Sequence, residues 1–255
     1  MHALVDSHVH LDLPPFHTDR DSVIARARDA GVRQLVVPAV DLDSWSGIAK
    51  LARDEVDVHP AYGLHPVYLA RHQPAHLDQL ATWLNDNPAV AVGEIGLDFH
   101  QPESDRDLQR HYFTNQLQLA GERRLPVIVH ARQALEEVIL TLRQVDGLRG
   151  VVHSFSGSEQ QARRLWEIGF HLGIGGPVTY ERAQRLRHIV ATMPIGFLLL
   201  ESDAPDQPDA NHRGQRNEPA RLTEVLRCVA ALRGESEAHV AEATTGNARR
   251  LFGIS

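Results

Sequence analysis

Val90-Ala91-Val92-Gly93-Glu94 is a short apolar run that ends in an acidic residue. Comparable runs recur along the chain, and several carry a potential metal ligand at or just after their carboxyl end. The candidate ligands are His8, His10, Glu94, His130, His153 and Asp203. Because an unpaired buried charge is very costly, Glu94 needs a partner, either a metal ion or an arginine. Strand ends that each deliver one ligand predict a converging metal centre, which points to a hydrolase.

Apolar, β-branched runs alternate with helical patterns over the whole sequence. The predicted strands are 3–9, 34–40, 57–63, 89–95, 126–130, 150–155, 170–175 and 197–201, and the predicted helices are 19–30, 43–54, 74–86, 103–123, 132–144, 158–168, 180–193, 217–232 and 236–251. Such units fit a closed barrel or an open doubly wound sheet. Only a closed ring easily brings ligands from five of these runs to one axis. We therefore predict an α/β protein with a (β/α)8 TIM barrel, over residues 1–255 as a single domain.

Composition limits the function classes and the compartment. Cys228 is the only cysteine, which excludes an intrachain disulfide and fits a reducing cytoplasm. The sequence shows no secretion signal, and no stretch approaches the roughly 18 apolar residues of a membrane span. We expect a cytoplasmic protein without membrane attachment, and nothing in the sequence indicates a stable protein partner. A net charge of −7 argues against non-specific coating of nucleic acid, but it is compatible with a nuclease whose cations lie at one pocket.

The candidate ligands divide into two groups. His8 and His10 are two residues apart, so on a strand both face the same side and can bind one ion. Glu94 has two oxygens and is the natural bridge to a second ion, since Lys50, the only lysine, lies in a helical pattern and cannot serve as a carbamylated bridge. Asp203 is predicted to bind the first ion and to accept a proton from the attacking water, with Glu201 as a competing candidate.

His130 and His153 each end a β-branched run, and together with Glu94 they make a sensible second site. Taken singly, either is more simply explained as a core histidine with its hydrogen bonds satisfied. Asp6 is a neighbour that is predicted to orient one of the histidines as a hydrogen-bond acceptor.

Other residues give weaker signals. His65 follows the third strand and is predicted to donate to a leaving oxygen or to bind phosphate, with a structural loop histidine as the alternative. Arg213 and Arg216 lie in a polar loop after the eighth strand and are predicted to clamp a phosphate, unless that loop is merely solvated. The segment 154–157 is predicted to offer backbone N–H groups to an anion.

Taken together, these motifs resemble those of the TatD family of metal-dependent deoxyribonucleases, within the amidohydrolase-like barrels. The resemblance covers essentially the whole chain and is carried, in the family's order, by residues 6–11, 63–66, 93–98, 126–130, 153–157, 201–205, 213–219 and 245–248. It implies a (β/α)8 barrel with divalent metals. By this resemblance His8, His10, Glu94 and Asp203 hold one ion, while Glu94, His130 and His153 hold the other. Residues 206–209 depart from the family's pattern, which bears on substrate preference.

The resulting hypothesis is a phosphodiesterase or deoxyribonuclease that uses two divalent ions, of zinc, manganese, magnesium or nickel, to activate water. Its substrate is DNA or a small phosphodiester, and its catalytic residues are Glu94, Asp203 and His65. One alternative is hydrolysis of an amide, ester or other small-molecule bond by the same metals. A second is a metal-stabilised binding barrel without catalysis, whose site would be closed to water.

Overall fold

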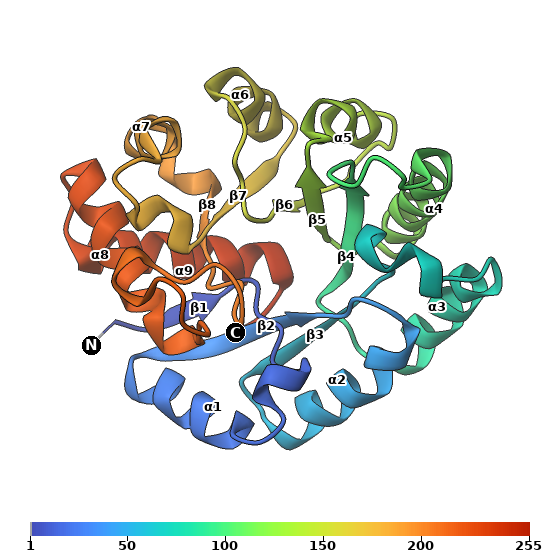
Figure 1. Ribbon diagram of the computed structural model, residues 1–255, viewed down its shortest axis with the longest axis horizontal. Helices are drawn as coiled ribbons and strands as arrows, with labels where there is room; N and C mark the ends of the chain where they lie inside the picture. Colours follow the sequence, from blue (N-terminus) through green and yellow to red (C-terminus); the bar gives the residue numbers. More distant parts are fainter. Residues whose placement is uncertain (1) are drawn as a thin grey trace.

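Parallel strands form one eight-stranded sheet in which each strand pairs with the next along the chain (Figure 1). The fold comes from a computed structural model, which describes residues 2–255. The strands are β1 (Leu4–Asp6), β2 (Val32–Pro38), β3 (Val58–Tyr62), β4 (Ala91–Asp98), β5 (Val127–Arg132), β6 (Gly150–Val152), β7 (Phe170–Ile174) and β8 (Leu198–Leu200). All the predicted strands are present, although β1 and β6 are shorter than predicted and β4 runs on to Asp98.

The ring is nearly closed, and the segments that follow β1 and β8 complete it. Ser7 donates its backbone N–H to Leu200 at 3.0 Å, and Asp203 donates to His8 at 2.9 Å. Farther along, the His10 N–H donates to the Ala204 carbonyl at 2.8 Å. The barrel is therefore confirmed over an open sheet, and its closure places the residues after β1 directly beside Asp203.

Helices surround the strands, as Figure 1 shows. They are α1 (Arg20–Asp29), α2 (Leu42–Asp54), α3 (Ala75–Asp86), α4 (Arg106–Arg123), α5 (Leu135–Leu142), α6 (Glu159–Glu167), α7 (Gln184–Thr192), α8 (Leu222–Arg233) and α9 (Glu237–Phe252). The helix predicted at 217–232 begins later, because Pro219–Arg221 form a separate 3-10 turn. Side-chain caps fix other starts: Asp41 accepts from the N–H of Ser44 before α2, and Ser158 accepts from Gln161 before α6.

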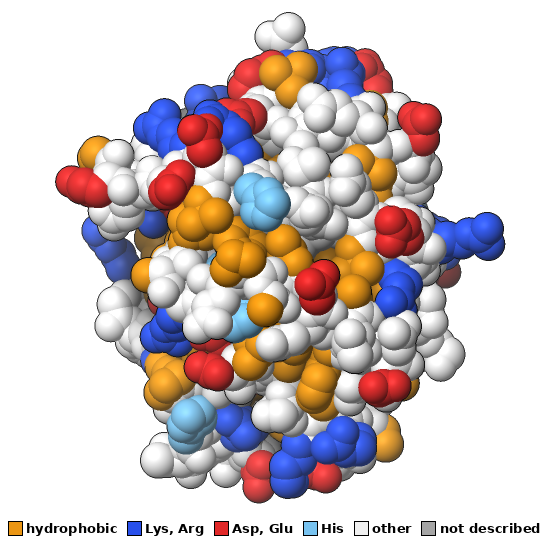
Figure 2. Space-filling view, turned by 90° about the vertical axis from the view of Figure 1, so that its right-hand side faces the viewer, with side chains coloured by type: hydrophobic (Ala, Val, Ile, Leu, Met, Phe, Trp, Pro, Cys, Tyr) orange, Lys and Arg blue, Asp and Glu red, His pale blue; other side chains and the backbone are white. Residues whose placement is uncertain are grey.

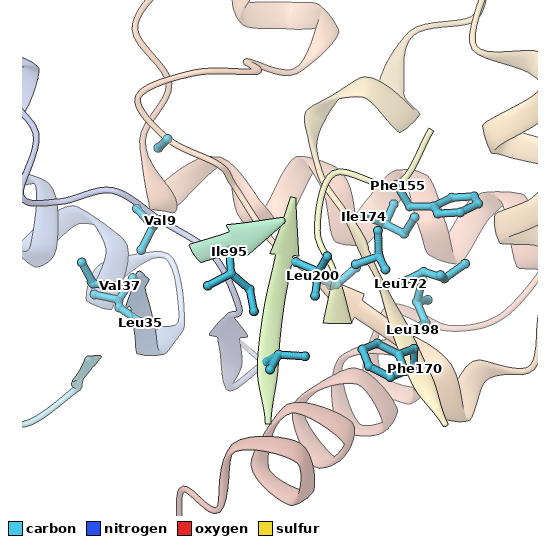
Figure 3. Packing of buried hydrophobic residues seen from close by; sticks show 14 of the residues in the cluster. Val9, Leu35, Val37, Ile95, Phe155, Phe170, Leu172, Ile174, Leu198 and Leu200 are labelled. Carbon is cyan, nitrogen blue, oxygen red and sulfur yellow. The ribbon is translucent and has the colours of Figure 1, made fainter. Parts of the chain in front are cut away.

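The core has two layers, because alternate strand residues face opposite sides of the sheet. The inner layer fills the barrel and is closed by the end of α9; its members are Val5, Val36, Ala61, Ala91, Ile128, Val151, Leu199, Ala248, Leu251, Phe252 and Ile254. The outer layer packs the sheet against the helices. Figure 3 shows part of it, with Leu172 and Ile174 of β7 beside Leu198 and Leu200 of β8.

The inner layer explains where the polar residues point. Ile128 of β5 belongs to it, so His130, two residues on, faces the same side. By the same spacing, His153 follows Val151 at the end of β6, and Glu201 follows Leu199 after β8. The polar side chains therefore lie over an aliphatic floor at the carboxyl ends of the strands, where barrel enzymes carry their active sites.

The surface shows no segregation of charge on the face drawn in Figure 2, where arginine and acidic side chains alternate around a central group of apolar ones. Within residues 2–255, no helix combines the length and the hydropathy needed to cross a membrane.

Candidate metal centre

The first group of predicted ligands converges. The Nε2 atoms of His8 and His10 lie 3.1 Å apart, and they lie 3.2 Å and 3.4 Å from Glu94 Oε2. Asp203 Oδ1 lies 3.6 Å from the Nε2 of His8 and 3.9 Å from that of His10. Four donor atoms from the ends of β1, β4 and β8 thus surround one point in space.

The second group gathers at the other oxygen of Glu94. Glu94 Oε1 lies 2.8 Å from His153 Nε2 and 3.1 Å from His130 Nδ1, and these two ring nitrogens are 3.3 Å apart. His65 Nε2 lies 2.9 Å from the same oxygen. One buried carboxylate therefore separates two clusters of imidazoles.

The backbone around Glu94 is tightly packed. Its N–H donates to the carbonyl of Ala39, just after β2, at 2.9 Å. On the other side, a Cβ added to Gly63 would lie 2.8 Å from the carbonyl carbon of Gly93, so only glycine at 63 lets this part of β4 approach the end of β3 so closely. The close contact fixes the position from which the Glu94 side chain starts.

Asp98, which the sequence interpretation gave no role, orients His130. Its Oδ2 lies 2.9 Å from His130 Nε2. Asp98 is itself held by Gln109 of α4, which accepts from its N–H and donates to its carbonyl, each at 2.8 Å. The carboxylate accepts the Nε2 proton, so the Nδ1 lone pair of His130 faces Glu94, the arrangement usual for a metal-binding histidine. The position of Asp98 at the end of β4, on the ligand side, is the signal that could have revealed it.

His65 has a defined tautomer. Its Nδ1 accepts the backbone N–H of Val67 at 3.0 Å, so in the neutral ring the proton lies on Nε2 and points to Glu94. Burial lowers the pKa of His65 to about 4, against the opposing effect of Glu94. His65 is therefore a neutral hydrogen-bond donor at the site.

Two buried acids do not have the predicted surroundings. Asp6 was predicted to orient a histidine ring, but its Oδ1 accepts the backbone N–H groups of Ser202 at 2.9 Å and of His8 at 3.3 Å. Glu201 is fully buried, and its Oε1 accepts the N–H of Ser154 at 2.5 Å. That contact corrects the prediction of a free anion-binding N–H at 154, because the carboxylate of Glu201 already occupies it. Both acids hold the backbone on which the ligands stand.

Burial and the neighbouring histidines have opposite effects on the pKa of Glu94. Burial alone would raise the pKa of Glu94, but the nearby His65, His153 and His8 outweigh it and hold that pKa well below its usual range. Burial raises the pKa of Glu201 to about 8 and that of Asp6 to about 7. Glu94 is therefore the fixed negative charge at the centre of the site.

A cavity of about 520 Å³ opens over these side chains. Glu94, His65, His130, His153, His10 and Asp203 all line it, together with Tyr68, Arg132, Ser154, Ser156 and Gln207. Arg132 lies two residues beyond His130 on β5 and was not singled out from the sequence. Among residues 2–255, those that line the cavity do not include Arg213 or Arg216. Arg216 instead forms a two-pronged ion pair with Asp19, at 2.7 Å and 2.8 Å.

A barrel with imidazoles and carboxylates converging at the carboxyl ends of its strands defines the class of metal-dependent hydrolases. Within that class the chain belongs to the TatD related DNase family, whose model matches residues 5–253. This confirms the resemblance seen in the motifs, and divalent metal ions are the cofactors of the class.

Relatives match over nearly their full length. The metal-dependent hydrolase YjjV of Escherichia coli is 39% identical, with 98% of each chain covered. The crystal structure of YjjV superposes with a TM-score of 0.95, covering 99% of this chain and 98% of that one at 37% identity. The protein named 3'-5' ssDNA/RNA exonuclease TatD of Salmonella typhimurium is 35% identical, covering 98% of this chain and 99% of the relative.

Proposed function

We propose that this chain is a metal-dependent phosphodiesterase or deoxyribonuclease, with nucleic acid (DNA) or a small phosphodiester as its substrate. The observation that carries the proposal is the position of Glu94, whose Oε2 faces His8 and His10 while Oε1 faces His130 and His153. A carboxylate placed in this way suits a pair of cations, the arrangement used by many phosphatases and nucleases. The Salmonella typhimurium relative, by its name an exonuclease, supports nucleic acid as the substrate class.

Six residues would hold the ions. His8, His10 and Asp203 with Glu94 Oε2 form the first donor set, and His130 and His153 with Glu94 Oε1 form the second. Nitrogen-rich sets suit zinc, manganese or nickel, whereas phosphoryl chemistry often runs on magnesium. The screen described below decides among these metals.

The hydrogen-bonding pattern supports cations at both places. His130 donates a hydrogen bond from its Nε2–H to Asp98, so the lone pair of its Nδ1 faces Glu94 Oε1 at 3.1 Å. Both of these facing atoms are hydrogen-bond acceptors. His8 and His10 likewise bring two ring nitrogens within 3.1 Å of each other, beside Glu94 Oε2. Such contacts are repulsive unless a proton or a metal ion lies between the atoms. The residues present therefore fit two divalent ions.

The protein groups then divide the work of hydrolysis. Bound divalent ions lower the pKa of water and polarise a phosphoryl oxygen. Asp203, at the rim of the cavity, accepts the proton that the attacking water loses as its oxygen bonds to phosphorus. The neutral His65 can stabilise the leaving oxygen through a hydrogen bond from its Nε2–H as the phosphorus–oxygen bond breaks, and the leaving oxygen takes its proton from solvent. Arg132 lines the same cavity and seats the phosphate by charge and hydrogen bonds.

Several features expected from the sequence stay predictions. A phosphate clamp at Arg213 and Arg216 stays a prediction, and so do the cytoplasmic location and the single domain. A closed, purely structural metal site is disfavoured by the cavity of about 520 Å³ that the donor side chains line.

A turnover screen tests the function. Single-stranded DNA, duplex DNA, RNA, bis(p-nitrophenyl) phosphate and a panel of amides and carboxylic esters are each incubated with the protein and zinc, manganese, magnesium or nickel. We expect metal-dependent cleavage of phosphodiesters and none of the carbonyl compounds. Cleavage confined to the carbonyl panel would favour the alternative hydrolase, and no cleavage by any metal-loaded form would contradict catalysis.

A further inference from the structure

A second groove continues from the candidate metal cavity. It has a volume of about 450 Å³ and shares three lining residues with that cavity, namely Ser154, Ser156 and Gln207. Its far wall is formed by the residues before and at the start of α7, including Arg182 and Arg185. A molecule bound at the metal centre can therefore extend over Gln207 into a groove with arginines on its far side.

Gln207 forms the junction between the two spaces. Its Nε2 donates to the Oδ2 of Asp203 and, at 2.7 Å, to the hydroxyl of Ser154. Gln207 therefore lies between the metal centre and the second groove, and it lines both spaces.

The two arginines in the groove carry free charge. Arg182 stacks over the ring of Tyr180, with its guanidinium carbon 5.4 Å from the ring centre. Arg185 donates to the carbonyl of Ser156 at 2.9 Å. Within residues 2–255, neither guanidinium has a carboxylate in ion-pair contact, whereas Arg163 and Arg164 on α6 bond to Glu159 and Glu136. Both groove arginines are exposed and available to an anion.

The opposite side of the cavity has the reverse charge. There a groove of about 430 Å³ is lined by three acidic residues, Asp98, Glu103 and Asp105, and by one arginine, Arg132. A polyanion seated at the metal centre is repelled on that side and attracted toward Arg182 and Arg185. The balance of charge thus favours exit of a bound strand toward Arg182 and Arg185.

We propose that the groove of Arg182 and Arg185 is a subsite for the phosphates that adjoin the scissile bond in a single-stranded nucleic acid. The inference rests on the proposed function and specifies where the neighbouring phosphates of the substrate bind. The groove has room for on the order of one nucleotide, since pockets of roughly 300–1,000 Å³ hold ligands of that size. A positively charged groove that follows the backbone is the usual means of holding a single strand.

The test compares two double variants that each remove two positive charges. R182A/R185A changes the groove, while R33A/R149A removes exposed arginines near the amino ends of β2 and β6, at the opposite end of the barrel. Binding of fluorescein-labelled decanucleotides of DNA and of RNA is measured by anisotropy, without added metal and at several salt concentrations. Turnover of the decanucleotides and of bis(p-nitrophenyl) phosphate is measured with metal.

We expect R182A/R185A to bind both decanucleotides at least about 10-fold more weakly, with the salt dependence reduced by about 1.4 in log–log slope for two lost phosphate contacts. Its KM for the decanucleotides should rise similarly, while turnover of bis(p-nitrophenyl) phosphate and all properties of R33A/R149A stay unchanged. Loss confined to DNA or to RNA would identify which strand uses the groove.

Unchanged decanucleotide binding by R182A/R185A, or an equal loss in R33A/R149A, would overturn the subsite. Equal loss of turnover on bis(p-nitrophenyl) phosphate would also overturn it, because that substrate has no phosphate beside the scissile one. R182A alone provides a second variant, since its side chain makes no hydrogen bond within residues 2–255, and it should show a smaller loss in the same direction. Absence of phosphodiester turnover in the unmodified protein would contradict the proposed function separately, while anisotropy would still test the groove.

Discussion

Asp98 Oδ2 lies 2.9 Å from His130 Nε2 and thereby turns the opposite ring nitrogen, Nδ1, toward Glu94. The two residues stand on neighbouring strands, β4 and β5, which pair with Asp98 opposite Arg132 and Gly96 opposite His130. The carboxylate thus fixes both the tautomer and the rotation of a proposed metal ligand without being a ligand itself.

Replacement of Asp98 by asparagine should weaken metal binding while leaving the ligand set complete. An amide can present its NH2 group to His130 Nε2 and so favour the wrong tautomer. Loss of such a partner typically costs about 10–100-fold in metal affinity or activity, and we expect a change in that range. Isothermal titration with zinc measures it. D29N, an identical change at an exposed residue of α1, is the control, and an affinity equal to that of the unmodified protein in D98N would contradict the orienting role.

Substitution of Glu94 by glutamine should reduce both metal occupancy and turnover. The amide keeps the shape of the side chain but loses the charge that two imidazole clusters share. We expect fewer than two ions per chain by elemental analysis and a loss of at least about 100-fold in kcat on a phosphodiester, since the ions stabilise the transition state by several kcal/mol.

D203N is the companion variant, and it should lower kcat to a similar extent through loss of the proton acceptor. Circular dichroism checks that both variants keep the barrel. Near-normal turnover in a folded E94Q or D203N protein would refute the assignment of that residue.

Removal of the metal should lower thermal stability. The imidazoles and carboxylates of the site are brought together only in the folded chain, so an ion binds the folded state alone. At a free ion concentration of 100 times Kd this stabilises by about 2.7 kcal/mol, which corresponds to a rise in Tm of about 5–11 °C for a chain of this size. Differential scanning calorimetry with added metal and with EDTA measures the shift. An H8A/H10A variant should show a smaller response, and a full response there would argue against the first site.

Sequence periodicity could predict the directions of His130 and His153, because strand residues two apart share a side. It could not predict that of Glu94, which lies three residues after the interior Ala91 and beyond a shift in the β4–β5 register. Once Ile128 and Val151 are assigned to the barrel interior, His130 and His153 must point to the axis. The short β-branched runs also mark where each strand ends. The position of a residue along its strand thus determines whether its side chain points to the barrel axis. Side chains at the strand ends that point to this axis lie close together.

The remaining contacts depend on which loops meet, and periodicity does not contain that information. Arg216 looks like a free cation in the sequence, but in the fold it meets Asp19, just before α1. Gln207 joins Asp203 to Ser154 because the loop after β8 folds back over the end of β6. These pairs bring together residues distant in sequence through irregular segments, so only the structure reveals them.

Arg132 should matter for phosphodiesters and not for neutral carbonyl compounds. A hydrogen bond to a charged group contributes about 1.5–3 kcal/mol, so R132A should lower kcat/KM on bis(p-nitrophenyl) phosphate by about 10–150-fold. R213A and R216A, measured in parallel, test the clamp predicted from the sequence. A larger loss in R213A or R216A than in R132A would move the phosphate contact to that loop.

Gly173 on β7 should resist even the smallest enlargement. A Cβ at this position would lie 2.0 Å from Glu201 Oε2, so the buried carboxylate would have to move and release the N–H of Ser154. Overpacking of this kind costs about 1–3 kcal/mol, and we expect G173A to lower Tm by about 2–12 °C and to weaken metal binding, because His153 precedes Ser154. The control is G196A, since no heavy atom lies within 4 Å of a Cβ there. Calorimetry and zinc titration of both variants check the expectation, and equal Tm values for G173A and G196A would show that Glu201 does not depend on the space that Gly173 leaves.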